Sequence, residues 1–147
     1  MRKLMTVAAL LVSLAGCATR GQYGNFAAAP TIHNAQMAED AVIQLKAFYP
    51  PAGTRLKLQQ PASDPFGTAL IGKLRQEGYA VMEATPRSNP WQGRADPTPG
   101  TDLRYVVDRL GGAEYLVVIR VGEGIISRSY RTDNNGLAAA GYWTRRE

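Results

Sequence analysis

Residues 103–132, LRYVVDRLGGAEYLVVIRVGEGIISRSYRT, decide the fold of this 147-residue chain. The short segments GG and GEG divide the stretch into three runs rich in β-branched and aromatic residues, at a spacing typical of hairpin turns. The middle run, YLVVIRV, is apolar on both faces and is predicted to be the central strand of a sheet. A fourth run, GLAAAGYWTRRE, follows the turn DNNG. The sequence therefore predicts an antiparallel β-meander.

The first of these runs, residues 103–110, is open to a second interpretation. Leu103, Val106, Val107 and Leu110 would also fall on one side of a helix. We favour the strand, and the helix remains the alternative.

A strand, a helix and a second strand precede the meander. Leucine alternates with polar residues in TRLKLQQ (54–60), which predicts a half-buried strand, and YAVMEAT (79–85) predicts another. Between them, Asp64 is a good N-cap, Pro65 suits the first helical position, and Gly78 suits the position after the helix. Two parallel strands joined in this way form a βαβ unit with a right-handed crossover.

A further helix is predicted over residues 35–48, where apolar residues recur at spacings of three and four. Asn34 is expected to cap this helix, and two prolines follow its end. The chain from 34 to 147 is therefore predicted to be a single α+β domain. It would consist of this helix, one βαβ unit and the antiparallel β-meander.

Two glycines, Gly67 and Gly72, interrupt the predicted helix of the βαβ unit. Each costs about 1 kcal/mol relative to alanine inside a helix. We therefore expect another part of the chain to pack closely against both.

Residues 1–16 have the three-part plan of a secretory signal peptide. Arg2 and Lys3 give a basic start, an apolar run follows, and small residues precede Cys17, the only cysteine of the chain. The apolar run is shorter than the roughly 20 residues needed to span a bilayer. A permanent membrane helix is therefore not expected here.

The tetrapeptide Leu14-Ala15-Gly16-Cys17 resembles the lipobox of bacterial lipoproteins. The resemblance implies that the Cys17 thiol receives a diacylglyceryl group and that the signal is cut between Gly16 and Cys17. Two or three acyl chains would follow, which is enough for stable anchoring. Ala18, in place of an aspartate, implies sorting to the outer membrane. We expect the domain to face the periplasm, with surface exposure left open. An ordinary signal peptide with an incidental cysteine is the alternative.

Residues 17–33 are mostly small or polar and rich in glycine and alanine, so they are predicted to be the lipidated cysteine and a flexible tether. Loss of the signal would lower the formal charge from +5 to +3, because Arg2 and Lys3 leave with it. A charge this small, without a basic helix or an aromatic-basic array, argues against direct nucleic-acid binding.

No residue pattern predicts catalysis, a metal, a cofactor or a small-molecule substrate. His33 is the single histidine and has no cysteine or carboxylate cluster near it, so a capping or solvent-exposed role is expected. Carboxylates such as Glu83 and Asp108, and serines such as Ser127, are scattered along strands and turns. A carboxylate pair could still converge in space, as in glycosidases.

Residues 86–102 contain four prolines and two glycines and are predicted to be a long loop, and such loops are often functional. Trp91 lies within it. Its ring is expected either to anchor a protein partner or to cover the core of the domain, and we favour the partner contact.

The segment DPFGTALIGKLRQEGYAV (64–81) and the stretch 99–147, together with the lipobox, resemble TrbH, a family of conjugal-transfer lipoproteins. The resemblance implies a component of the mating-pair-formation apparatus, a type IV secretion machine that exports plasmid DNA and protein. It implies no active site. It implies instead an outer-membrane lipoprotein that anchors or stabilises larger protein subunits. A lipid-anchored cell-wall enzyme or enzyme activator is the alternative.

Overall fold

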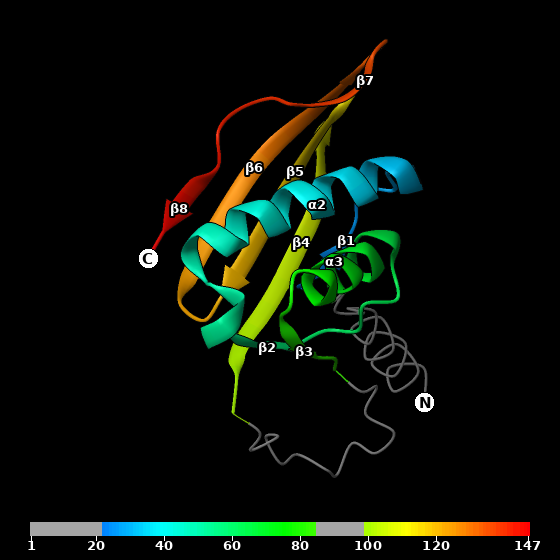
Figure 1. The fold of residues 1–147 in the computed structure, drawn as a ribbon. Coiled ribbons are helices and arrows are strands. Elements are labelled where there is room, and N and C mark those ends of the chain that lie inside the picture. Colours follow the sequence, from blue (N-terminus) through cyan, green and yellow to red (C-terminus); the bar gives the residue numbers. More distant parts are fainter. Residues whose placement is uncertain (1–21, 85–98) are drawn as a thin grey trace, which may run out of the picture.

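The computed structural model describes residues 22–84 and 99–147, which form two helices on one side of a single sheet (Figure 1). The predicted α+β class is confirmed. In chain order the elements are β1 (Gly24–Asn25), α2 (Thr31–Phe48), the 3-10 turn η1 (Pro51–Gly53), β2 (Arg55–Leu58), α3 (Pro65–Gln76), β3 (Ala80–Met82), β4 (Thr101–Gly111), β5 (Glu114–Val121), β6 (Gly124–Asp133), β7 (Gly136–Ala139) and β8 (Thr144–Arg146).

The strands lie in the order β3-β2-β4-β5-β6-β7, with β1 beside β4 and β8 beside β6. The predicted βαβ unit is confirmed, because β2 and β3 are parallel neighbours joined through α3. The predicted meander is confirmed by the antiparallel pairing of β4 with β5, β5 with β6 and β6 with β7. β4 also pairs in parallel with β2, and this contact joins the two halves into one sheet.

The run at 103–110 belongs to strand β4, so its helical interpretation is wrong. Leu103, Tyr105 and Val107 are at most 1% exposed, while the residues between them are more accessible. Burial that alternates with a period of two is the mark of a strand with one face on the core.

The chain already belongs to the folded domain at β1, which corrects the expectation of a flexible tether for residues 22–33. β1 pairs with β4, Ala27 is buried, and α2 begins at Thr31. The rest of the expected tether, residues 17–21, lies outside the described residues.

Asn34 is not the N-cap of α2, which is a correction of the predicted helix start. It lies fully buried inside the first turn, and its Nδ2 donates to the carbonyls of Ala29 at 2.8 Å and Pro30 at 3.1 Å. Its Oδ1 accepts from Asn25 Nδ2 at 2.9 Å. The side chain thus satisfies carbonyls before the helix and links β1 to α2.

α3 starts as predicted, with Asp64 as its N-cap. Oδ1 of Asp64 accepts from the N–H of Gly67 at 2.9 Å, and Oδ2 accepts from the hydroxyl of Tyr105 on β4. Burial raises the pKa of Tyr105 above its ordinary 10.0, and the hydrogen bond to Asp64 raises it further. The hydroxyl therefore stays protonated, and one carboxylate fixes both the start of α3 and its position over the sheet.

The expectation of close packing is confirmed at Gly67 and is wrong at Gly72. A Cβ on Gly67 would lie 2.9 Å from Cζ of Tyr105 and 3.0 Å from Cα of Ala62, and closer still to the tyrosine hydroxyl. A Cβ on Gly72 would meet nothing within 4 Å. Only the first glycine is required by the approach of α3 to the sheet.

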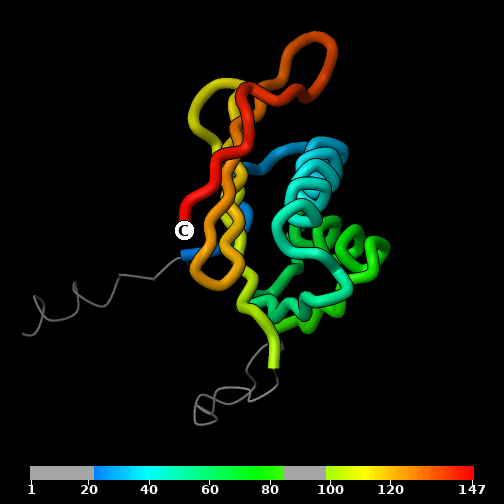
Figure 2. The backbone as a smooth tube through the Cα atoms, turned by 60° about the vertical axis from the view of Figure 1, so that its left-hand side comes forward, coloured from blue at the N-terminus to red at the C-terminus, as the bar shows by residue number. Residues whose placement is uncertain are grey.

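The described chain is a two-layer structure, with α2 and α3 on the same side of the sheet (Figure 2). The hydrophobic core lies between these layers and is built from alternate residues of β4, β5 and β6 packed against both helices. No described helix covers the opposite side, which we call the helix-free face.

Candidate functional site

The polar residues considered for catalysis do not come together in the described chain. Glu83 forms an ion pair with Arg75 at 2.7 Å, and Asp108 accepts a hydrogen bond from the backbone N–H of the next residue. Ser127 Oγ lies 2.7 Å from Thr144 Oγ1 rather than beside a base. Each of these groups thus has a local partner.

His33 lies in the first turn of α2, where its Nδ1 is buried without a hydrogen-bond partner. Among the residues at 22–84 and 99–147, no group of three or more histidine, cysteine, aspartate or glutamate side chains is arranged to hold a metal ion. His33 is therefore not part of a metal-ligating cluster among the described residues.

The least exposed ion pair among the described residues joins α2 to the sheet. Asp40 accepts from Arg128 Nη1 at 2.8 Å and from the Tyr130 hydroxyl at 2.6 Å. Burial raises the pKa of Tyr130 above 10.0, the hydrogen bond to Asp40 raises it further, and the charge of Arg128 opposes the shift. The tyrosine remains a neutral donor, and the cluster fixes α2 on β6.

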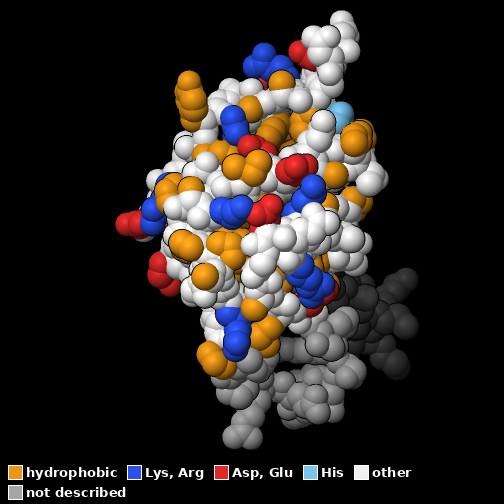
Figure 3. Space-filling view, viewed as in Figure 1, with side chains coloured by type: hydrophobic (Ala, Val, Ile, Leu, Met, Phe, Trp, Pro, Cys, Tyr) orange, Lys and Arg blue, Asp and Glu red, His pale blue; other side chains and the backbone are white. Residues whose placement is uncertain are grey.

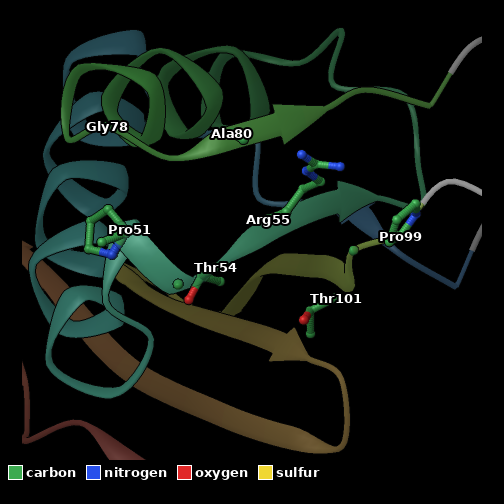
Figure 4. A pocket seen from close by; sticks show the side chains of 10 residues that line it. Pro51, Thr54, Arg55, Gly78, Ala80, Pro99 and Thr101 are labelled. Atoms are coloured by element: carbon green, nitrogen blue, oxygen red, sulfur yellow. The ribbon is translucent and has the colours of Figure 1, made fainter.

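A hollow of about 780 Å³ opens at the end of the sheet where η1, β2, β3 and β4 meet (Figure 4). The side chains of Thr54, Arg55 and Thr101 border it, together with the ring of Pro51. Among the described residues, its lining offers one guanidinium, two hydroxyls and no carboxylate. Pro99 and Gly100, which end the gap in the described chain, also line it.

The helix-free face carries a row of three arginines. In the strand register, Arg104 of β4 stands opposite Arg120 of β5, Arg120 opposite Ile125 of β6, and Ile125 opposite Arg146 of β8. All four residues project to the same side, because paired residues of neighbouring strands share a face. We call Arg104, Arg120 and Arg146 the arginine row.

The arginine row lacks acidic partners within the part of the chain that the structure describes. None of the ion pairs found there includes Arg104, Arg120 or Arg146. Like charges placed directly opposite one another on a sheet are destabilising. The facing guanidinium groups of Arg104 and Arg120 therefore repel each other, and no ion pair among the described residues offsets this repulsion.

An aliphatic strip lies next to the arginine row on the same face. Val106 stands opposite Val118, and Leu116 follows on β5, with all three side chains partly accessible. Together with Ile125, they give the helix-free face an apolar centre beside its basic row.

The same face also carries carboxylates, because Asp102 and Asp108 alternate with the buried residues of β4 and Glu114 with those of β5. Asp108 stands opposite Leu116, and Glu114 forms an ion pair with Arg131. Acidic and basic side chains are interspersed on the side that carries the helices as well (Figure 3).

The start of the described chain reaches the helix-free face. The guanidinium carbon of Arg104 lies 5.1 Å from the centre of the Tyr23 ring. A second hollow of about 430 Å³ adjoins this point and is bordered by Arg104, Arg120, Asp102 and Glu123. Gln59 Nε2 donates to Asp102 at 2.8 Å.

The arginine row was missed by the sequence analysis. The alternation within each strand places Arg104 and Arg120 on the polar side, and this signal was available. Their juxtaposition, however, depends on the register between strands, and Arg146 enters the row only through the pairing of β8 with β6.

The predicted lipidation and cleavage positions, Cys17 and Gly16, and the predicted partner contact, Trp91, lie outside the described residues. No helix among the described residues is long and apolar enough to cross a membrane.

The family model of the conjugal transfer protein TrbH matches residues 20–147. Comparisons with curated proteins and with solved structures gave no match. The match takes in every described element, from β1 through the helices to β8. The chain therefore belongs to the TrbH family of conjugal transfer proteins.

Proposed function

We propose that this protein is an outer-membrane lipoprotein and a structural component of a conjugative type IV secretion apparatus. A lipid on Cys17 holds the domain at the membrane, and the domain anchors or stabilises larger protein subunits of the mating-pair-formation complex. The domain faces the periplasm in this proposal.

The observation that carries the proposal is the family match over residues 20–147, which starts just after the lipobox. Membership of the family assigns the protein to conjugal transfer. The lipobox resemblance of Leu14-Ala15-Gly16-Cys17 supplies its attachment to the membrane. A lipobox cysteine carries two or three acyl chains, and about two chains suffice for stable anchoring. The arginine row, which lacks acidic partners among the described residues, and the partly accessible aliphatic strip add a surface that a structural component could use.

The direct test is to separate the inner and outer membranes of conjugating donor cells and to measure the mass of the N-terminal peptide. We expect the protein in the outer-membrane fraction, with a peptide that begins at an acylated Cys17. A protease added to intact cells should leave it uncut. An unmodified peptide, or one that begins elsewhere, would contradict the proposal.

A structural role predicts that single polar side chains are dispensable for transfer. We expect His33→Ala, Glu83→Gln, Asp108→Asn and Ser127→Ala to leave the transfer frequency near the wild-type value. Substitutions at accessible positions change stability by about 0.5 kcal/mol or less, and the buried Nδ1 of His33 has no hydrogen bond to lose. Mating assays, with the protein level checked by immunoblot, measure this. A loss of transfer at normal abundance from any one of them would favour the lipid-anchored enzyme.

The partner contact predicts a specific effect of Trp91→Ala. Aromatic anchors of interfaces often contribute about 2 kcal/mol or more. We therefore expect less recovery of partner subunits from donor membranes, with an unchanged melting temperature of the purified protein. If the ring covers the core instead, the melting temperature falls by several degrees and partner recovery is maintained.

A further inference from the structure

We infer that the helix-free face of the sheet docks on the phospholipid headgroup layer of the membrane that holds the protein, with Arg104, Arg120 and Arg146 contacting headgroup phosphates. The inference rests on the proposed lipidation of Cys17. It adds an orientation of the domain on the membrane and a set of side chains that maintains it.

The first argument is the reach of the chain between the lipid and the domain. Five Cα–Cα steps separate Cys17 from Gln22, and they span at most about 18 Å when fully extended. The described chain begins on the side of the sheet away from α2 and α3 (Figure 2). The contact of Tyr23 with Arg104 places this start against the helix-free face. A lipid on Cys17 therefore holds that face close to the bilayer.

The opposite orientation is hard to reach with so short a connection. A helix with its side chains is about 10–12 Å across, and the sheet adds further thickness. With α2 and α3 against the membrane, the connection would have to cross both layers almost fully extended. The helix-free face is the side that meets the headgroups without this constraint.

The second argument is the chemistry of the face. Guanidinium groups bind phosphate oxygens in a bidentate manner, and basic side chains are attracted to an anionic lipid surface. Arg104 and Arg120 stand opposite each other without an acidic partner among the described residues, and Arg146 continues the row. A headgroup phosphate between Arg104 and Arg120 would relieve the repulsion that the strand register imposes.

The aliphatic strip is compatible with the same occupant. Val106, Val118 and Leu116 lie beside the row and can pack against glycerol and the upper acyl carbons. Asp102 and Glu123 line the same hollow as Arg104 and Arg120, and Asp108 stands opposite Leu116 at the far end of the strip. These carboxylates confine the phosphate contacts to the arginine row itself.

The test uses the lipidated mature protein in vesicles of phosphatidylcholine and phosphatidylglycerol. Because the lipid occupies the only native cysteine, an introduced cysteine is the one free thiol. One variant carries Ser127→Cys, at a position that stands opposite Val118 on the helix-free face. Another carries Ile43→Cys on α2, where Ile43 is 64% exposed. Each is labelled with a fluorophore, and quenching by a lipid with a nitroxide headgroup is measured.

We expect quenching at position 127 to be several-fold stronger than at position 43. Replacing the arginine row with glutamine should reduce quenching at 127, because each arginine near an anionic surface contributes about a fivefold factor to docking. High salt should reduce it as well, through screening. The matched control is Lys46→Gln, Lys73→Gln and Arg75→Gln, which removes three charges on the helix side and should leave quenching at 127 unchanged.

Equal quenching at both positions, or stronger quenching at 43, would overturn the inference. Unchanged quenching at 127 in the arginine variant would also overturn it, because the row would then not hold the face on the lipid. If the face instead binds a protein, the label at 127 will be protected in donor membranes and unquenched in vesicles. Failure of the proposed function is distinct, because the purified protein would then lack acyl mass and would not insert into vesicles.

Discussion

Replacing Cys17 with serine is expected to remove the protein from the membrane and to reduce plasmid transfer to the level of donor cells that lack it. The lipobox resemblance implies that the lipid is attached to the sulfur of Cys17. Serine has a hydroxyl in place of this sulfur nucleophile, so the lipid cannot be attached. Each buried methylene contributes about 0.8 kcal/mol, so one acyl chain contributes about 10 kcal/mol of anchoring before its costs.

Metabolic labelling with palmitate, membrane fractionation and mating assays measure the three consequences. Ala18→Asp is the matched control, because it changes the adjacent residue and keeps the thiol, so its palmitate label should persist. Palmitate incorporation into Cys17→Ser at the wild-type level would refute the lipid assignment. Normal transfer by an unlabelled, released protein would refute the requirement for anchoring.

Local sequence signals predicted most of the sheet. In the sequence, the glycines at 111, 112 and 122 separate apolar runs, which predicts turns between strands. In the structure, both places are hairpins, and these glycines have positive φ. The helix signals at Asp64 and Pro65 were equally local, and α3 starts there. Features encoded within a few neighbouring residues could therefore be read without the structure.

Features that depend on distant contacts could not be predicted. Residues 22–33 look like a tether by composition, yet Asn34 reaches back to Asn25 and β1 pairs with a strand some 80 positions later. Asn34 also looked like an N-cap, because a sequence does not reveal that a buried amide will bind the carbonyls of Ala29 and Pro30. Each interaction stabilises a conformation that the local residues do not favour.

The same division between local signals and distant contacts applies to the candidate surface. The predicted lipobox is a contiguous tetrapeptide, so the resemblance that carries this prediction is visible directly in the sequence. The arginine row consists of residues from β4, β5 and β8, and only the register of the sheet aligns them. A proposed membrane contact built from single residues of several strands has no linear signature.

The largest effect on folding is expected from Gly67→Ala, because α3 approaches β4 too closely for a side chain at this position. The new methyl group would overlap Tyr105, which is 1% exposed and whose hydroxyl is held by Asp64. Overpacking of this kind costs about 1–3 kcal/mol or more. Even after the better helix propensity of alanine, which offsets about 1 kcal/mol, we expect the free energy of unfolding to fall by about 2 kcal/mol.

Thermal melting of the mature protein in detergent measures this loss, which corresponds to a decrease of roughly 8 °C for a domain of this size. Gly72→Ala is the matched control on the same helix, because its Cβ meets nothing within 4 Å. It should leave the melting temperature unchanged or raise it. A combination with Tyr105→Phe removes the overlapping hydroxyl, so the double variant should lose less stability than the two single losses added together. Equal melting temperatures for Gly67→Ala and Gly72→Ala would show that α3 can move away from β4 at little cost.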